Sequence, residues 1–158
     1  MESLLPIIYQ GLEITELEDD DTALEDTGDD AKWTVSRAAA ALLQEVAVLV
    51  RDPVWGPTVD YMSPKLNSNN WREQYIGMTA LGSVLEGPCP ELIADQMAGP
   101  FSAIMTMVDT NQVDRVRFTS AQAITKMCMV VPQLALVSEE CLAAMFTTCI
   151  NRISNDHW

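Results

Sequence analysis

The sequence is short of the residues from which most metal and catalytic sites are built. Its one histidine is His157, next to the last residue, and its four cysteines form no Cys-x-x-Cys pair. Zinc sites need clustered thiolates or imidazoles, so this composition argues against one. No glycine-rich phosphate loop occurs, and no motif pairs a serine or cysteine nucleophile with a histidine. The sequence therefore predicts a protein that is not an enzyme, with no metal and no cofactor.

Long apolar runs and basic residues are also scarce. No apolar stretch approaches the roughly 20 residues of a membrane span, and 9 Lys and Arg stand against 23 Asp and Glu. The formal net charge of −14 argues against nucleic acid and anionic membrane as direct partners. The chain shows no signal peptide, so we expect free thiols in a reducing cytosolic compartment.

The acidity is concentrated in one segment. Ten of the residues from Glu13 to Asp30 are Asp or Glu, and no Lys or Arg occurs before Lys32. Like charges at this density repel one another, and a cationic partner would relieve that repulsion, so the segment suits a basic protein partner. A solvated, disordered loop that only aids solubility explains the same composition. Calcium is a third interpretation, although the acids lack the EF-hand spacing.

The rest of the chain has a helical pattern, without the period-two runs that are typical of strands. Helices are expected over residues 3–13, 33–51, 57–67, 71–86, 91–108, 113–131 and 138–154. We expect Pro64 to disturb the third helix, Pro100 to kink the fifth and Ser138 to cap the last. Trp55 and Trp158 are uninformative and are given no role.

Three of the expected helices can be aligned without gaps. The register positions Arg37, Gln74 and Arg117 lie 37 and 43 residues apart, and the third residue after each is small: Ala40, Gly77 and Ser120. We expect these small residues to let the helix of one repeat approach the helix of the next. The period is typical of HEAT or armadillo helix pairs. The sequence predicts an all-α solenoid with helix pairs over residues 1–52, 53–87 and 90–132, and a final first helix over 136–154.

The stretch "NNWREQYIGMTALGSVLEGPCPELI" resembles a central HEAT repeat of the importin-β (karyopherin-β) family. In that family the turn reads like Asp-Trp-Arg and the second helix ends in Leu-Glu-Gly-Pro-x-Pro. The matching residues are Trp71, Arg72, Leu85, Glu86, Gly87, Pro88 and Pro90. In that family the preceding repeat carries an acidic loop closed by a tryptophan. Residues 13–31 resemble this loop, and Trp33 stands at its end. Tyr75 and Phe118 depart from the family's tendency to aspartate, and Gln122 stands where some members carry an inner-surface tryptophan.

The resemblance implies a fragment of a nuclear import receptor, acting in the cytoplasm, in the nucleus and at the nuclear pore and envelope. Implied partners are an importin-α-type adaptor or basic cargo segment, the GTPase Ran in its GTP form, and phenylalanine-glycine nucleoporins. The acidic-loop residues expected to contact them are Glu16, Glu18, Asp19, Asp20, Asp21, Glu25, Asp26, Asp29 and Asp30. Trp33 is either a stacking platform for a basic side chain or a buried anchor.

A generic HEAT-repeat scaffold, such as a phosphatase scaffolding subunit, remains the alternative. It would not need so dense an acidic insertion. Both ends of the chain look cut, and a truncated solenoid exposes apolar faces that neighbouring repeats would cover. We therefore expect self-association or modest stability.

Overall fold

The computed structural model describes residues 4–14, 34–110 and 113–135, and four single residues at 143, 146, 147 and 150. All of its regular structure there is helical, which confirms the predicted all-α class. The elements are α1 (Leu4–Glu13), α2 (Val35–Val50), the 3-10 helix η2 (Asp52–Val54), α3 (Trp55–Leu66), α4 (Trp71–Val84), α5 (Pro90–Thr110), α6 (Asp114–Val130) and α7 (Pro132–Ala135). The helix expected over residues 138–154, with its cap Ser138, lies almost wholly outside the described residues.

Polar side chains fix where two of the helices begin. Thr34 precedes α2, and its Oγ1 accepts a hydrogen bond from the backbone N–H of Arg37 at 3.2 Å. Asn70 precedes α4 in the same way, with its Oδ1 3.0 Å from the backbone nitrogen of Arg72. Each cap satisfies a backbone donor that the first turn of a helix leaves unpaired. The second helices of the first two pairs therefore start at positions that local chemistry sets.

The expectation for Pro64 needs correction. α3 begins at Trp55, two residues before the predicted start, and continues through Pro64 to Leu66. A proline removes one backbone hydrogen bond, but Pro64 lies in the last turn of the helix, where few hydrogen bonds remain to be lost. α5 continues across Pro100, and the kink expected there stays a prediction. The short helix α7 is an addition that the sequence did not predict. None of the described helices is long and apolar enough to cross a bilayer.

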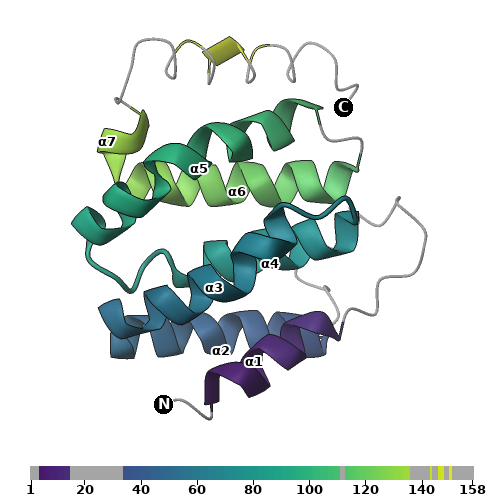
Figure 1. Cartoon of the computed structure of the whole chain (residues 1–158), viewed down its shortest axis with the longest axis vertical. Coiled ribbons are helices and arrows are strands. Elements are labelled where there is room, and N and C mark those ends of the chain that lie inside the picture. The colour runs from purple at the N-terminus through teal and green to yellow at the C-terminus, as the bar shows by residue number, and fades with distance from the viewer. Residues whose placement is uncertain are drawn as a thin grey trace.

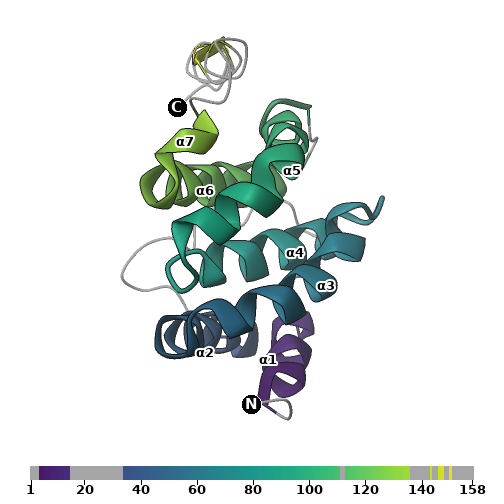
Figure 2. The same ribbon diagram turned by 60° about the vertical axis from the view of Figure 1, so that its left-hand side comes forward.

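The helices form two layers (Figures 1 and 2). Three helix pairs, α1 with α2, α3 with α4 and α5 with α6, stack one above another. Figure 2 shows α2, α4 and α6 on one side and α1, α3 and α5 on the other. The backbones of α2, α4 and α6 pack directly on one another, whereas those of α1, α3 and α5 approach at few points. Closer spacing on one side curves a stack toward that side, so we call α2, α4 and α6 the inner layer.

The small residues serve a different purpose from the expected one, at least at Gly77. A Cβ atom there would lie 2.9 Å from Leu66 Cδ2 and 3.3 Å from Lys65 Cβ. Both belong to α3, the first helix of the same pair. Gly77 therefore allows close packing within its repeat, and the expectation that it lets neighbouring repeats approach is wrong. The close approach between repeats occurs at Gly87, just after α4, which lies against the backbone of Ala47 in α2.

Long side chains bridge the wider gaps of the outer layer. The rings of Tyr9 in α1 and Tyr61 in α3 are stacked, with centroids 4.2 Å apart. The Tyr9 hydroxyl is bonded to Thr58 Oγ1 at 2.9 Å, and the Tyr61 hydroxyl lies 3.2 Å from the Tyr9 carbonyl oxygen and 3.3 Å from Glu13 Oε1. Lys65 Nζ pairs with the same Glu13 oxygen at 2.7 Å. This cluster joins the first two pairs where their backbones are apart.

Burial raises the pKa of Tyr61 above its ordinary value, and the neighbouring Glu13 carboxylate raises it further. Burial also raises the pKa of Tyr9, where the hydrogen bond to Thr58 acts in the opposite direction and the Asp60 charge in the same one. The folded chain therefore holds both phenolic protons more tightly than the unfolded chain does. The resulting stabilisation is complete below the ordinary tyrosine pKa of about 10 and is lost as the pH rises above it.

We therefore expect the free energy of unfolding to be lower at about pH 10.5 than at about pH 8, since the unfolded chain loses these protons first. Urea unfolding at the two pH values measures the difference. The control is Tyr61→Phe, which keeps the stacked ring and removes one of the two titrating groups, so its loss over the interval should be smaller. Equal losses in both proteins would show that Tyr61 is not responsible.

Candidate functional site

The acidic residues predicted as contacts, from Glu16 to Asp30, lie outside the described residues, as does Trp33. The structure does describe the helices on either side of them. α1 ends at Glu13, and Thr34 caps the start of α2. Leu12, near the end of α1, and Ser36, near the start of α2, line the same small pocket. The acidic segment therefore leaves and rejoins the fold beside this pocket.

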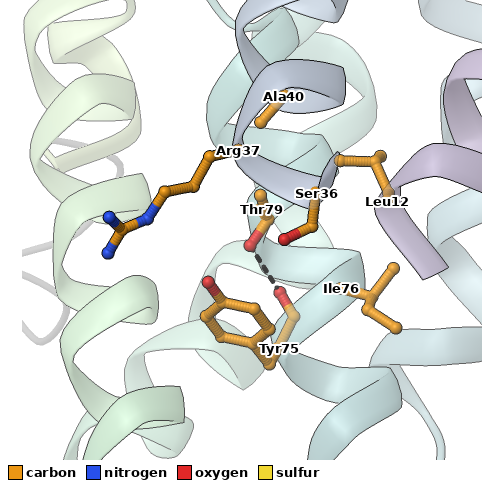
Figure 3. A pocket seen from close by; sticks show the side chains of 7 residues that line it. All are labelled: Leu12, Ser36, Arg37, Ala40, Tyr75, Ile76 and Thr79. Carbon is orange, nitrogen blue, oxygen red and sulfur yellow. Dashed lines mark hydrogen bonds between the residues drawn. The ribbon is translucent and has the colours of Figure 1, made fainter. Parts of the chain in front are cut away.

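The pocket lies between α1, α2 and α4 and has a volume of about 40 Å³. Its lining residues are Leu12, Ser36, Arg37, Ala40, Tyr75, Ile76 and Thr79. In Figure 3, Leu12 and Ile76 lie on one side, and the Arg37 side chain extends away from them on the other. A volume of this size admits a water molecule or two, or the tip of one side chain, but no larger ligand.

A larger groove continues from the pocket along the inner layer. It lies between α4 and α6 and has a volume of about 660 Å³. The lining residues are Tyr75, Met78, Thr79, Gly82, Ser83, Phe118, Thr119, Ala121, Gln122, Ala123, Thr125 and Lys126. Tyr75 and Thr79 line both the pocket and the groove, so the two form one continuous surface that begins where the acidic segment is attached.

The groove walls are more apolar than their composition indicates. The hydroxyls of Thr79 and Ser83 donate to the carbonyls of Tyr75 and Thr79 at 2.8 Å, one turn earlier in α4. In α6, Thr119 and Thr125 bond in the same way to carbonyls four residues earlier, each at 2.9 Å. A hydroxyl that is satisfied by its own helix has little left to offer a ligand. The walls therefore present mainly methyl groups and the rings of Tyr75 and Phe118.

A polar network closes the far end of the groove. Lys126 Nζ donates to the Gly82 carbonyl at 3.0 Å and lies 3.5 Å from Glu86 Oε1. The amide of Gln44 in α2 donates to the other Glu86 oxygen at 3.3 Å. The network joins three consecutive helix pairs, but its ion pair is partly exposed, and such pairs contribute little to stability. Lys126 is therefore held in place and still able to meet a ligand.

The described part of the chain does not gather the side chains of a metal site. No group of three or more His, Cys, Asp or Glu side chains gathers there as a metal site would require. Cys89 is exposed and Cys128 is half-buried, and neither forms a disulfide within the described part of the chain. The pocket and the groove are thus candidate contact surfaces for a partner.

Comparison with known proteins supports the resemblance seen in the sequence. No protein-family model matches the chain. Importin subunit beta-1 of Schizosaccharomyces pombe is 33% identical over 64 residues, which are 40% of this chain and 7% of that protein. Yeast importin-β (Kap95p) shares the fold in two solved complexes. The complex with RanGDP gives a TM-score of 0.81 at 20% identity, covering 99% of this chain and 17% of Kap95p, and the Nup1 complex gives 0.82 at 19%, covering 98% and 17%.

The chain is similar in part of its sequence to importin subunit beta-1, and it shares the fold of importin-β. It spans less than a fifth of the length of these relatives. Its described helices match the HEAT-repeat solenoid of importin-β almost from end to end, which confirms the predicted fold.

In the structure, the three residues that depart from the importin-β pattern lie close together. Tyr75, Phe118 and Gln122 line the same groove. In the sequence, nothing brings these three residues together. The signal was present in the repeat register, because Tyr75 and Phe118 each follow a register position, Gln74 and Arg117, by one residue. Corresponding positions of two consecutive second helices form the two walls.

Proposed function

We propose that this chain is part of a nuclear import receptor that binds a basic cargo segment or importin-α-type adaptor and, in alternation, the GTP form of Ran. The acidic segment supplies the electrostatic contact, through Glu16, Glu18, Asp19, Asp20, Asp21, Glu25, Asp26, Asp29 and Asp30, with Trp33 available for stacking. The chain takes no part in catalysis. It acts in the cytoplasm, in the nucleus and at the nuclear pore, where phenylalanine-glycine nucleoporins are further partners.

The observation that carries the proposal is the attachment of the acidic segment beside the inner groove. Residues next to both of its ends, Leu12 and Ser36, line the pocket from which the groove continues. A partner held on the inner layer would therefore lie near the points where the acidic segment joins the described helices. The known complexes of Kap95p with RanGDP and with Nup1 support Ran and nucleoporins as partners of this family member.

Neutralising the acidic segment tests the proposal. We expect a variant with Asp19, Asp20, Asp21, Asp29 and Asp30 changed to Asn to bind a basic adaptor peptide at least roughly tenfold more weakly at low salt. The difference should shrink at physiological salt, because screening already weakens the unmodified contact. Fluorescence anisotropy with a labelled adaptor peptide measures it, and Ran loaded with a GTP analogue is titrated in parallel. The same pair of proteins is made in the full-length receptor.

The matched control neutralises five acids of the described helices instead: Glu45, Asp60, Glu73, Glu91 and Asp95. Both variants remove the same number of negative charges from a chain of formal net charge −14, so they differ only in where the charge is lost. Equal weakening would assign the effect to net charge alone. Unchanged binding by the full-length acidic-segment variant would overturn the proposal and favour a structural scaffold.

A further inference from the structure

The groove lacks the negative charge that a basic ligand would require. None of the twelve described lining residues is an aspartate or glutamate, and one of them is a lysine, Lys126. Arg37 lines the adjoining pocket beside Tyr75. Glu86 is the carboxylate that pairs with Lys126 at the end of the groove, and it also accepts a hydrogen bond from Gln44. The acidic segment and the groove therefore favour ligands of opposite sign.

The groove has the dimensions and the surface for a helix. Its lining runs from Tyr75 to Ser83 in α4 and from Phe118 to Lys126 in α6, about 12 Å or two helical turns on each wall. Aromatic rings stand at one end, Met78 forms part of the buried floor, and the threonines of the walls present methyl groups. A groove between two helices that is lined in this way accepts the apolar face of a third, with side chains spaced by three or four residues.

Two polar groups in the groove lack a partner of their own. The Tyr75 side chain is half-buried and the Gln122 side chain is exposed, and neither forms a hydrogen bond within the described part of the chain. Such polar groups are satisfied by water or by a ligand. They lie among apolar neighbours, so they can orient a ligand without providing a charge for it.

We propose that the groove between α4 and α6 binds an amphipathic helix of a partner protein whose buried face is apolar and which carries a carboxylate opposite Lys126. The inference rests on the proposed function, because it assigns to the same receptor a second, separate contact. A large apolar side chain of the partner packs between Tyr75 and Phe118. Its carboxylate, two turns further on, pairs with Lys126, whose amine exchanges part of its contact with Glu86. Basic segments are left to the acidic segment.

Three synthetic 18-residue helical peptides test this. The first carries leucines at positions i, i+3 and i+4 with glutamates one turn beyond, the second has lysines in place of the glutamates, and the third has serines in place of the leucines. Anisotropy gives each dissociation constant for the full chain, and the NMR signal of the Met78 methyl group, assigned with Met78→Leu, reports on occupation of the groove. We expect the first peptide to bind most tightly and to shift the Met78 signal.

Matched variants locate the contact. Phe118, which is 43% exposed, is changed to alanine, and we expect roughly tenfold weaker binding of the first peptide. Ile7, 64% exposed on α1, is the control, and Ile7→Ala should leave the affinity unchanged. Lys126→Gln should reduce the preference for the acidic over the basic peptide. Phe118→Asp should reverse that preference, since it places a carboxylate in the wall.

An unmoved Met78 signal, equal or tighter binding of the basic peptide in the groove, or equal effects of Phe118→Ala and Ile7→Ala would each overturn the inference. Its failure can be told from failure of the proposed function. The groove response should persist when the five aspartates of the acidic segment are neutralised, whereas binding of the basic adaptor peptide should not. Loss of only one of the two responses identifies which proposal is wrong.

Discussion

Replacing Trp55 by alanine should lower the free energy of unfolding by about 3–5 kcal/mol, the largest loss we expect from a single substitution. Trp55 is 1% exposed and stands at the start of α3. Its indole Nε1 donates to Gln96 Oε1 in α5 at 2.8 Å, which joins the second and third helix pairs through their outer helices. Alanine would leave a large cavity at this junction and would also remove the bridge.

Urea unfolding followed by circular dichroism measures the effect. Trp55→Phe separates its two parts, because it keeps most of the apolar volume and removes only the donor, and we expect it to cost about 1–2 kcal/mol. Trp71→Ala is the matched control, since Trp71 is only partly buried and its ring contacts Arg72, with the guanidinium carbon 5.3 Å from the ring centroid. A cost at Trp55 no larger than at Trp71 would contradict the assignment of Trp55 to the core.

Gly87→Ala should destabilise the chain by about 3 kcal/mol, because rigid backbone leaves no room for the added methyl group. A Cβ at this position would lie 2.6 Å from the carbonyl carbon of Ala47 and 2.9 Å from its Cβ, and the carbonyl oxygen would be closer still. The end of α4 would have to move away from α2. Because the change separates two repeats, it should also lower the cooperativity of unfolding.

The control is Gly82→Ala in α4, five residues earlier. A Cβ at Gly82 meets no atom within 4 Å. Alanine has the higher helix propensity, so this variant should be more stable than the parent by about 0.5–1 kcal/mol. Opposite signs for the two variants in a urea titration would confirm the packing argument. A loss at Gly87 below about 1 kcal/mol would mean that the interface between α2 and α4 yields easily.

The helices themselves were predictable because their signals are local. The apolar period of 3.6 residues and the break at Asp52 and Pro53 gave most boundaries to within one or two residues. Trp55 was not interpretable in the same way, since the prolines and glycine around it mark a break and its partner Gln96 is 41 residues further along the chain. Only the stacking of one pair on the next brings the two together.

The inner surface was predictable only in part. The resemblance to importin-β marks Tyr75 and Phe118 as departures from the family pattern, yet neither it nor the alignment of the repeats says which face of a helix meets its neighbour. Gly77 shows the consequence, because a small residue at a shared register position packs inside its own pair. Likewise, the groove lining contains four serine and threonine side chains, and only the three-dimensional structure shows that they bond to their own helices.

These hydroxyl bonds have a mechanical consequence for the whole solenoid. A serine or threonine bonded to the preceding turn slightly weakens and bends its helix, and such bonds occur in α3, α4, α5 and α6. α2, in contrast, has no serine or threonine after Ser36. We therefore expect α2, which lies next to the acidic segment in the chain, to be stiffer than α3, α4, α5 and α6. When a partner binds, the strain should spread as small bends along α3 to α6, so that the molecule deforms like a spring anchored at one end.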